Sequence, residues 1–217
     1  MKLLSKILFV LVVIFASGGL LANDASALKL SNGTQWSNTA IKVCWLNPKA
    51  SDSRWRQVVK SAVESSWEAV AAVDFHGWRK CTQRDVRTSI ILDAGDRKVG
   101  VIGPNDGLGI NASRIQLNFT FNRWPCAGCR ENRGQAIRFH AIHEFGHLLG
   151  FDHEHSPYCP SPIYRFRYTR LSQDDPNSIM RTCYQPGFEP RLSRMDIESV
   201  QQVYGKSWSA VAREFEF

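Results

Sequence analysis

The chain has 217 residues, of which 27 are basic and 20 acidic, and its formal net charge at pH 7 is +7. This basic excess is modest and spread along the sequence, so it can favour acidic surfaces or substrates but does not indicate nucleic acid. Residues 28–217 are enough for one domain with a sizeable core, and we expect a monomer.

Residues 1–27 predict a secretory signal peptide. Lys2 and Lys6 precede an apolar run at 7–16, and small residues then lead to Ala27, after which we expect cleavage. A membrane anchor is the alternative, but the apolar run is short for a bilayer span and is followed by glycines. We therefore expect a secreted product without membrane attachment, extracellular or, in a Gram-negative bacterium, periplasmic.

Six cysteines follow the predicted signal peptide. An even number of cysteines in an exported chain indicates three disulfides, although six cysteines allow fifteen pairings. The pairs that we expect are Cys44 with Cys81, Cys126 with Cys129, and Cys159 with Cys183.

Hydrophobic periodicity predicts a mixture of strands and helices. Residues 41–45 alternate like a strand, and residues 52–72 carry apolar side chains at helical spacing, which predicts a long amphipathic helix. Three further strands are predicted at 88–93, 99–102 and 114–121. A second helix is expected to begin near Gly134 or Gln135 and to bury the apolar side chains between residues 136 and 149.

This second helix carries a pattern typical of a metal site. His143 and His147 are four residues apart, so that both imidazoles point from one face of the helix. Gly150 can adopt the left-handed conformation that ends a helix and turns the chain back, which brings His153 in as a third ligand. Three imidazoles leave a fourth tetrahedral position open, as expected of a catalytic zinc site.

Glu144 is the candidate general base. It lies beside the first predicted ligand, where its carboxylate could take a proton from a zinc-activated water and return it to a leaving amine. Surface histidines on an amphipathic helix are the alternative, but the combined spacing of His, Glu and Gly disfavours it. His140 and His155 are expected to be exposed or to lie outside the ligand set.

From His143 to His153 the chain resembles the metzincin clan of zinc metallopeptidases, whose signature is H-E-x-x-H-x-x-G-x-x-H followed by a methionine turn. Met180 matches the methionine that packs beneath the histidines in that clan. The resemblance implies a zinc cofactor, a protein or peptide substrate and an α+β fold. That fold has a twisted mixed sheet, two long helices, a C-terminal helix and an active-site cleft across the middle. It also implies a free edge strand near 98–103 that pairs with extended substrates.

Finer features resemble particular subgroups of the clan. Glu154 follows the third histidine as in astacins, but residues 155–159 then depart from the astacin pattern. Astacins place a zinc-binding tyrosine where this chain has Thr182, so Tyr184 is a possible oxyanion donor or fifth ligand. Residues 192–205 resemble the closing helix of matrixins and astacins, with Ser193 as its N-cap.

Two further patterns leave alternatives open. Asp93, Asp96 and Asp106 with nearby glycines faintly resemble the calcium loops of matrixins, but their spacing fits no calcium loop pattern, so solvated turns are the better interpretation and calcium stays uncertain. Residues 164–170 alternate aromatic and basic side chains, a pattern that can bind single-stranded nucleic acid by stacking and charge. In an exported chain an amphipathic strand or hairpin with solvated arginines is the better interpretation. Arg165 and Arg167 could bias specificity toward acidic side chains.

Together these features predict a secreted zinc-dependent endopeptidase. Two other classes of protein remain open. One is a binding module that keeps zinc for stability, although Glu144 argues against a purely structural site. The other is a zinc hydrolase of non-peptide amides, since the motif cannot distinguish a peptide bond from another amide bond.

Overall fold

The computed structural model describes residues 28–103, 107–123, 126–154, 168–170, 175–181 and 184–215. The predicted signal peptide lies outside these residues, as do His155 and residues 164–167 of the basic and aromatic segment. In this part of the chain, no helix combines the length and the apolar character needed to cross a membrane.

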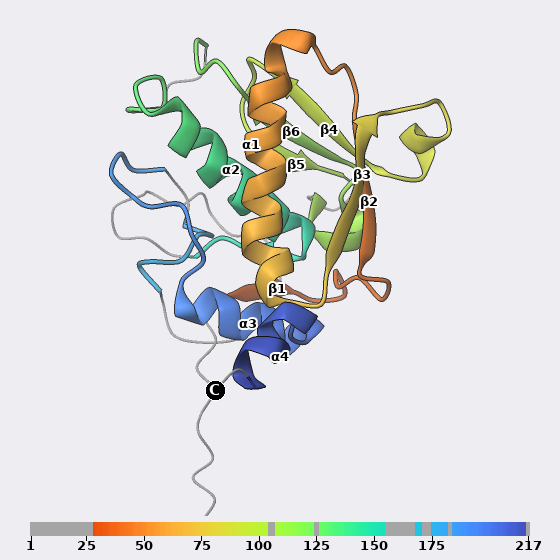
Figure 1. Cartoon of the computed structure of the whole chain (residues 1–217), viewed down its shortest axis with the longest axis vertical. Coiled ribbons are helices and arrows are strands. Elements are labelled where there is room, and N and C mark those ends of the chain that lie inside the picture. The colour runs from red at the N-terminus through yellow and green to blue at the C-terminus, as the bar shows by residue number, and fades with distance from the viewer. Residues whose placement is uncertain are drawn as a thin grey trace, which may run out of the picture.

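A five-stranded mixed sheet forms one layer of the domain (Figure 1). Its strands, in the order β3-β2-β4-β6-β5, are Asp74–Lys80, Ala40–Trp45, Ile90–Gly95, Arg114–Asn118 and Gly100–Ile102. The first four run parallel to one another, whereas β5 pairs antiparallel with β6 and ends the sheet. The edge strand predicted near 98–103 is therefore confirmed as the edge.

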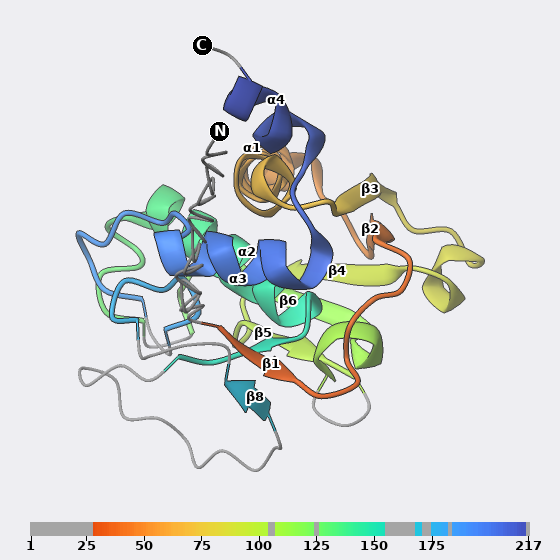
Figure 2. The same ribbon diagram turned by 90° about the horizontal axis from the view of Figure 1, so that it is seen from below.

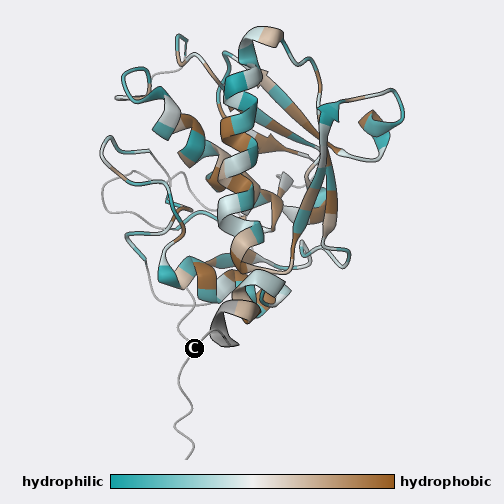
Figure 3. Ribbon diagram, viewed as in Figure 1, coloured by the Kyte–Doolittle hydropathy of each residue, from teal (hydrophilic) through white to brown (hydrophobic). Residues whose placement is uncertain are grey.

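Two long helices cover one face of the sheet. Helix α1 (Ser53–Val63) follows a 3-10 turn, η1 (Ala50–Asp52), and continues into a π-helical segment, η2 (Glu64–Glu68). Helix α2 (Arg133–Leu148) packs against α1. The indole of Trp67, fully buried between them, donates from Nε1 to Ile142 O at 2.8 Å. Figure 3 shows hydrophobic residues on the strands behind α1 and hydrophilic residues on its outer turns.

A smaller sheet and two C-terminal helices complete the described fold, as Figure 2 shows. Strand β1 (Lys29–Ser31) lies between β7 (Phe151–Asp152) and β8 (Tyr168–Arg170), antiparallel to both. Helix α3 (Arg194–Tyr204) begins at Ser193, and the predicted N-cap is confirmed by a complete capping box with Asp196. Helix α4 (Trp208–Phe215) follows. Strands, two long helices and a C-terminal helix confirm the predicted α+β class.

Several details differ from the prediction. The strand predicted at 114–121 ends at Asn118, because the Asn118 side chain accepts the N–H groups of Thr120 and Phe121 and turns the chain. Strand β3 was not predicted. Positive φ angles at Gly77 and Trp78 interrupt the extended backbone there, so the side chains do not alternate regularly between the two faces of the sheet. Strand β1 and helix α4 were also missed.

Two of the three expected disulfides are confirmed, Cys44–Cys81 and Cys126–Cys129. The third expected pair lies outside the described residues, because Cys159 and Cys183 are both among those not described.

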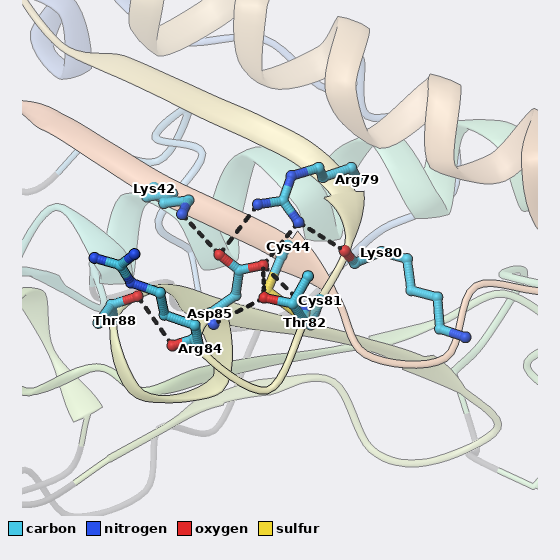
Figure 4. Close-up of a disulfide and its surroundings, with 9 residues drawn as sticks. All are labelled: Lys42, Cys44, Arg79, Lys80, Cys81, Thr82, Arg84, Asp85 and Thr88. Carbon is cyan, nitrogen blue, oxygen red and sulfur yellow. Dashed lines mark hydrogen bonds and ion pairs between the residues drawn. A yellow bond between two sulfur atoms is a disulfide. The ribbon is translucent and has the colours of Figure 1, made fainter.

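The disulfide between β2 and the end of β3 lies beside a buried carboxylate (Figure 4). Asp85 accepts from Lys42 Nζ at 2.7 Å and from Arg79 Nη1 at 2.7 Å. It also accepts from the backbone N–H and the hydroxyl of Thr82, at 2.9 and 2.7 Å. The hydrogen bond from Lys42, followed by those from Thr82 and Arg79, holds the pKa of Asp85 well below its usual range.

Asp85 should therefore make stability depend on pH in a defined direction. A carboxylate whose pKa is depressed in the folded state contributes stability above its ordinary pKa of 3.8, and this contribution is lost as the pH falls below that value. We expect Asp85→Asn to unfold at lower urea than wild type at pH 7. The gap between the two free energies of unfolding should narrow at pH 3, and a gap that widens there would contradict this account.

Candidate metal centre

Three imidazoles converge at the C-terminal end of α2. His143 and His147 project from the helix, and His153 follows β7. One ligand atom of each lies within 4.8 Å of the other two, and the Nε2 atoms of His147 and His153 are 3.2 Å apart. Zinc bound tetrahedrally at its usual distance to nitrogen would separate neighbouring ligand atoms by about 3.3 Å. The spacing of His147 and His153 therefore fits a shared zinc ion.

Backbone carbonyls fix the orientation of two of these rings. His143 Nδ1 donates to Ile179 O at 2.8 Å, and His147 Nδ1 donates to Phe151 O at 2.7 Å. A carbonyl can only accept, so each ring carries its proton on Nδ1 and presents the lone pair of Nε2. Such outer hydrogen bonds hold a histidine ligand in the tautomer that a metal requires.

Gly150 returns the chain so that His153 reaches the other two histidines. Its φ is 93°, and its N–H donates to His147 O at 2.9 Å, which ends α2 as predicted. A Cβ at this position would lie 2.6 Å from Thr34 Oγ1, so the turn requires glycine for space as well as for conformation. The Gly150 carbonyl then accepts from Ser31 N at 3.0 Å, which joins the turn to β1.

Met180 packs against α2 close to the histidines. Its side chain is fully buried, and a Cβ built on Gly146 would collide with its sulfur and lie 3.0 Å from Trp67 Cζ2. Gly146, between Glu144 and His147, thus permits the close approach of the methionine turn to the helix.

Asp196 holds this turn in place, a role that no sequence pattern indicates. From the first turn of α3 its carboxylate accepts from Ser178 Oγ at 2.6 Å and from Ile179 N at 2.9 Å. The carbonyl of Ile179 in turn orients His143. Burial raises the pKa of Asp196 to about 6, and these hydrogen bonds lower it again in part. Asp196 therefore connects α3 to the candidate metal centre.

The environment keeps the three histidines neutral at pH 7. Burial lowers the pKa of His143 well below its usual value and also lowers that of His147. Burial, followed by the nearby His147, lowers the pKa of His153 to about 3. Neutral imidazole is the form that binds a metal ion, so the donors fit zinc.

Glu144 lies beside this group without belonging to it. Only 5% of its surface is exposed, and burial raises the pKa of its carboxyl to about 8, against an opposing effect of the positive charge of Lys98. Its Oε2 atom is buried and has no hydrogen-bond partner among the residues that the structure describes. A buried carboxylate oxygen without a partner is costly, which favours a functional rather than a structural role.

The remaining candidate residues lie around this centre. Tyr184 is buried, with its ring centroid 5.5 Å from that of Phe139 and 6.2 Å from that of His140. His140 is itself 6% exposed and lies outside the ligand group, so of the two alternatives for this residue the surface position is excluded. Burial lowers the pKa of His140 to about 4. Glu154 is also buried, and its N–H donates to Met180 O at 2.9 Å.

The aspartates considered for calcium have protein partners where they are described. Asp93 lies 3.4 Å from Arg114 Nη1, and Asp96 accepts from Thr120 Oγ1 and from Asn122 N. Asp106 lies outside the described residues. These contacts do not test calcium binding, which the sequence left uncertain.

The sheet order, the two long helices and the position of the histidines confirm a metzincin-like fold. Two solved structures share it: "Structure of Myroilysin" and "Crystal structure of myroilysin", each with a TM-score of 0.54 and 19% sequence identity. The first match covers 79% of this chain and 82% of the other, and the second covers 80% and 86%. At this level of identity the likeness shows a common fold.

The sequence also matches matrix metalloproteinase-25 of Homo sapiens, with 36% identity over 84 residues. The match takes in 37% of this chain but spans only 12% of the length of that relative. No family model matches the chain.

The contact between Gly146 and the methionine turn can be tested by adding one methyl group. We expect Gly146→Ala to lower the free energy of unfolding by about 1–3 kcal/mol, because Met180 and Trp67 must move. Gly134→Ala, in the first turn of the same helix with no atom within 4 Å of the new Cβ, is the matched control and should stabilise by about 0.5 kcal/mol. Equal effects in urea denaturation would show that Gly146 is not packed as described.

The role of Asp196 predicts a second effect. We expect Asp196→Asn to lower the free energy of unfolding by about 2 kcal/mol, because an amide cannot accept from Ser178, Ile179 and Ser193 at once. Zinc affinity should fall roughly 10-fold as the carbonyl that orients His143 shifts. Glu198→Gln, on the same helix, removes a carboxylate that pairs with Arg194 and should leave zinc affinity unchanged. Equal zinc affinities in the two variants, by competitive chelator titration, would refute the connection.

Proposed function

We propose that the protein is a secreted zinc-dependent endopeptidase in which His143, His147 and His153 hold the metal. The observation that carries this proposal is the convergence of three neutral imidazoles, two of them buried and anchored through Nδ1 to backbone carbonyls. A structural zinc site has no need of a general base. Here Glu144 lies beside the ligands, and its Oε2 atom has no hydrogen-bond partner among the described residues.

When bound, zinc would lower the pKa of a water molecule and polarise the carbonyl of the scissile bond. Glu144 would accept a proton from that water at its carboxylate and pass it to the leaving amine. Its position next to His143 on α2 keeps the carboxylate at the centre without making it a ligand. Met180 would support the ligands by packing against α2 at Gly146. The buried hydroxyl of Tyr184 would be available to donate a hydrogen bond to the substrate.

The edge strand β5 supports a peptide substrate. It ends the sheet order beside β6 and packs against α2, which carries two of the histidines. An unpaired strand edge offers N–H and C=O groups that can pair with an extended peptide irrespective of its sequence. The name of matrix metalloproteinase-25 also points to proteolysis.

Export after cleavage behind Ala27 and a single catalytic domain at 28–217 are part of the same proposal. Two disulfides among the described residues support it, because disulfides persist in oxidising compartments. We also propose that the protein acts as a monomer.

Glu144→Ala separates the chemistry from metal binding. Expressed from Leu28, wild type and variant should each bind about one zinc per chain. Cleavage of a mixed peptide library by the variant should fall by a factor on the order of 1,000, because proton transfer is lost while the ligands remain. Mass spectrometry of the products and metal analysis of both proteins give the two readouts.

The matched control is Glu131→Ala, which removes an exposed carboxylate just before α2 and should leave turnover unchanged. A fully active Glu144→Ala protein would contradict the assignment. Zinc binding without cleavage by the wild type would instead favour a binding module or a hydrolase of non-peptide amides.

A further inference from the structure

The turn between the second and the third predicted zinc ligand has backbone carbonyls that α2 cannot satisfy. The last four carbonyls of a helix lack N–H partners within it, and here they include those of Leu148 and Leu149. Both residues are fully buried, so water does not reach these carbonyls. A buried carbonyl without a donor is costly, and these groups therefore require donors from elsewhere in the chain.

Two aromatic side chains supply these donors. Trp36 Nε1 donates to Leu148 O at 2.7 Å. The hydroxyl of Tyr204, the last residue of α3, donates to Leu149 O at 2.7 Å. The backbone N–H of Trp36 in turn donates to the Tyr204 hydroxyl at 3.4 Å. The two side chains therefore form one group that holds the end of α2.

Two residues of β1 hold the rest of the turn. Ser31 N donates to Gly150 O at 3.0 Å, and Lys29 Nζ donates to His153 O at 3.3 Å. Each carbonyl from the end of α2 to Gly150, and also that of the third predicted ligand, thus has a donor from a distant segment of the chain.

His153 depends on this turn more than the other two histidines do. The rings of His143 and His147 are fixed through Nδ1 by backbone carbonyls. The Nδ1 atom of His153 is 3.9 Å from Asp152 Oδ1, which is too far for a hydrogen bond, and no other residue in the described ranges bonds to it. The position of the His153 ring is therefore set by the backbone that carries it.

Tyr204 is suited to hold this backbone. Burial raises the pKa of its phenol to about 12, so the hydroxyl keeps its proton and donates at neutral pH. Its ring lies edge-on to that of Phe151, with centroids 6.5 Å apart. Because the Phe151 carbonyl orients His147, Tyr204 contacts the chain on both sides of Gly150.

We infer that Tyr204 and Trp36 are positioning residues of the metal centre, because they fix the turn that brings His153 to the zinc ion. They would thereby determine how tightly zinc is bound and in what geometry, although neither side chain is a ligand. The inference rests on the proposed function, in which these histidines hold zinc, but it does not depend on the kind of bond that is cleaved.

Tyr204→Phe removes a single hydroxyl and keeps the ring. We expect its zinc affinity, measured by competitive chelator titration of the chain expressed from Leu28, to fall roughly 10-fold. In the cobalt-substituted protein the visible absorption reports ligand geometry, and its tetrahedral band should weaken. Trp36→Phe removes the Nε1 donor to Leu148 O and should act in the same direction.

Ser207→Ala is the matched control. Ser207 is buried between α3 and α4, and its hydroxyl donates to Ala69 O at 2.8 Å, outside the turn. Each variant loses a hydrogen bond to a backbone carbonyl, so each zinc-loaded protein should melt at least roughly 2 °C below the wild type. Zinc affinity should fall in Tyr204→Phe and stay unchanged in Ser207→Ala.

A His153→Ala background tests whether the effect passes through the third ligand. If it does, Tyr204→Phe should change the residual zinc affinity less than about 2-fold in that background. An undiminished effect would overturn the inference, because the hydroxyl would then act on another part of the centre.

Equal zinc affinities of the wild type and Tyr204→Phe, or an equal fall in Ser207→Ala, would also overturn the inference. If Tyr204→Phe does not fold, Trp36→Phe decides the question at the neighbouring carbonyl. A wild type that binds zinc but cleaves no peptide would end the peptidase proposal, and the zinc affinities would still test the positioning role.

Discussion

The hydrogen bond from His143 Nδ1 to the carbonyl of Ile179 joins the parts of the chain that form the candidate metal centre. It connects α2 to the methionine turn, and Asp196 connects that turn to α3. A similar bond from His147 to Phe151 connects the helix to β7 and thus to the small sheet. Elements separated by many residues must therefore all be in place before the imidazoles can share one ion.

This arrangement carries an energetic cost that a metal ion would offset. His143, His147 and Glu144 are buried and His153 is partly buried. The pKa of each of these groups is displaced in the direction that favours its neutral form. Binding a cation would favour the charged carboxylate and use the nitrogen lone pairs, so metal binding and folding are expected to support each other. Residues such as Gly146 and Gly150 are constrained by the close packing on which the centre depends.

Local patterns in the sequence predicted the parts of the fold that have a clear period. The spacing of His143 and His147, the glycine turn before His153 and both long helices follow from rules that act within a few residues. The edge position of the strand near 98–103 was implied by the resemblance to metzincins. Strand β3 was missed because its two residues with positive φ remove the alternation. Strand β1 was missed because three residues are too short to show a period.

The role of Asp196 could not be predicted for a different reason. Asp196 reads as an ordinary N-terminal helix residue, and its second function depends on a turn that lies 17 residues earlier in the chain. The informative fact is a tertiary contact, which no local pattern encodes.

The most direct test of the central claim is a crystal structure of the zinc-loaded protein with anomalous diffraction measured at the zinc edge. The account predicts a single strong peak bound by the Nε2 atoms of His143, His147 and His153, each at about 2.0–2.1 Å. It also predicts that Glu144 faces this ion without binding it. A zinc ion elsewhere, or one whose ligands exclude any of the three histidines, would contradict the account.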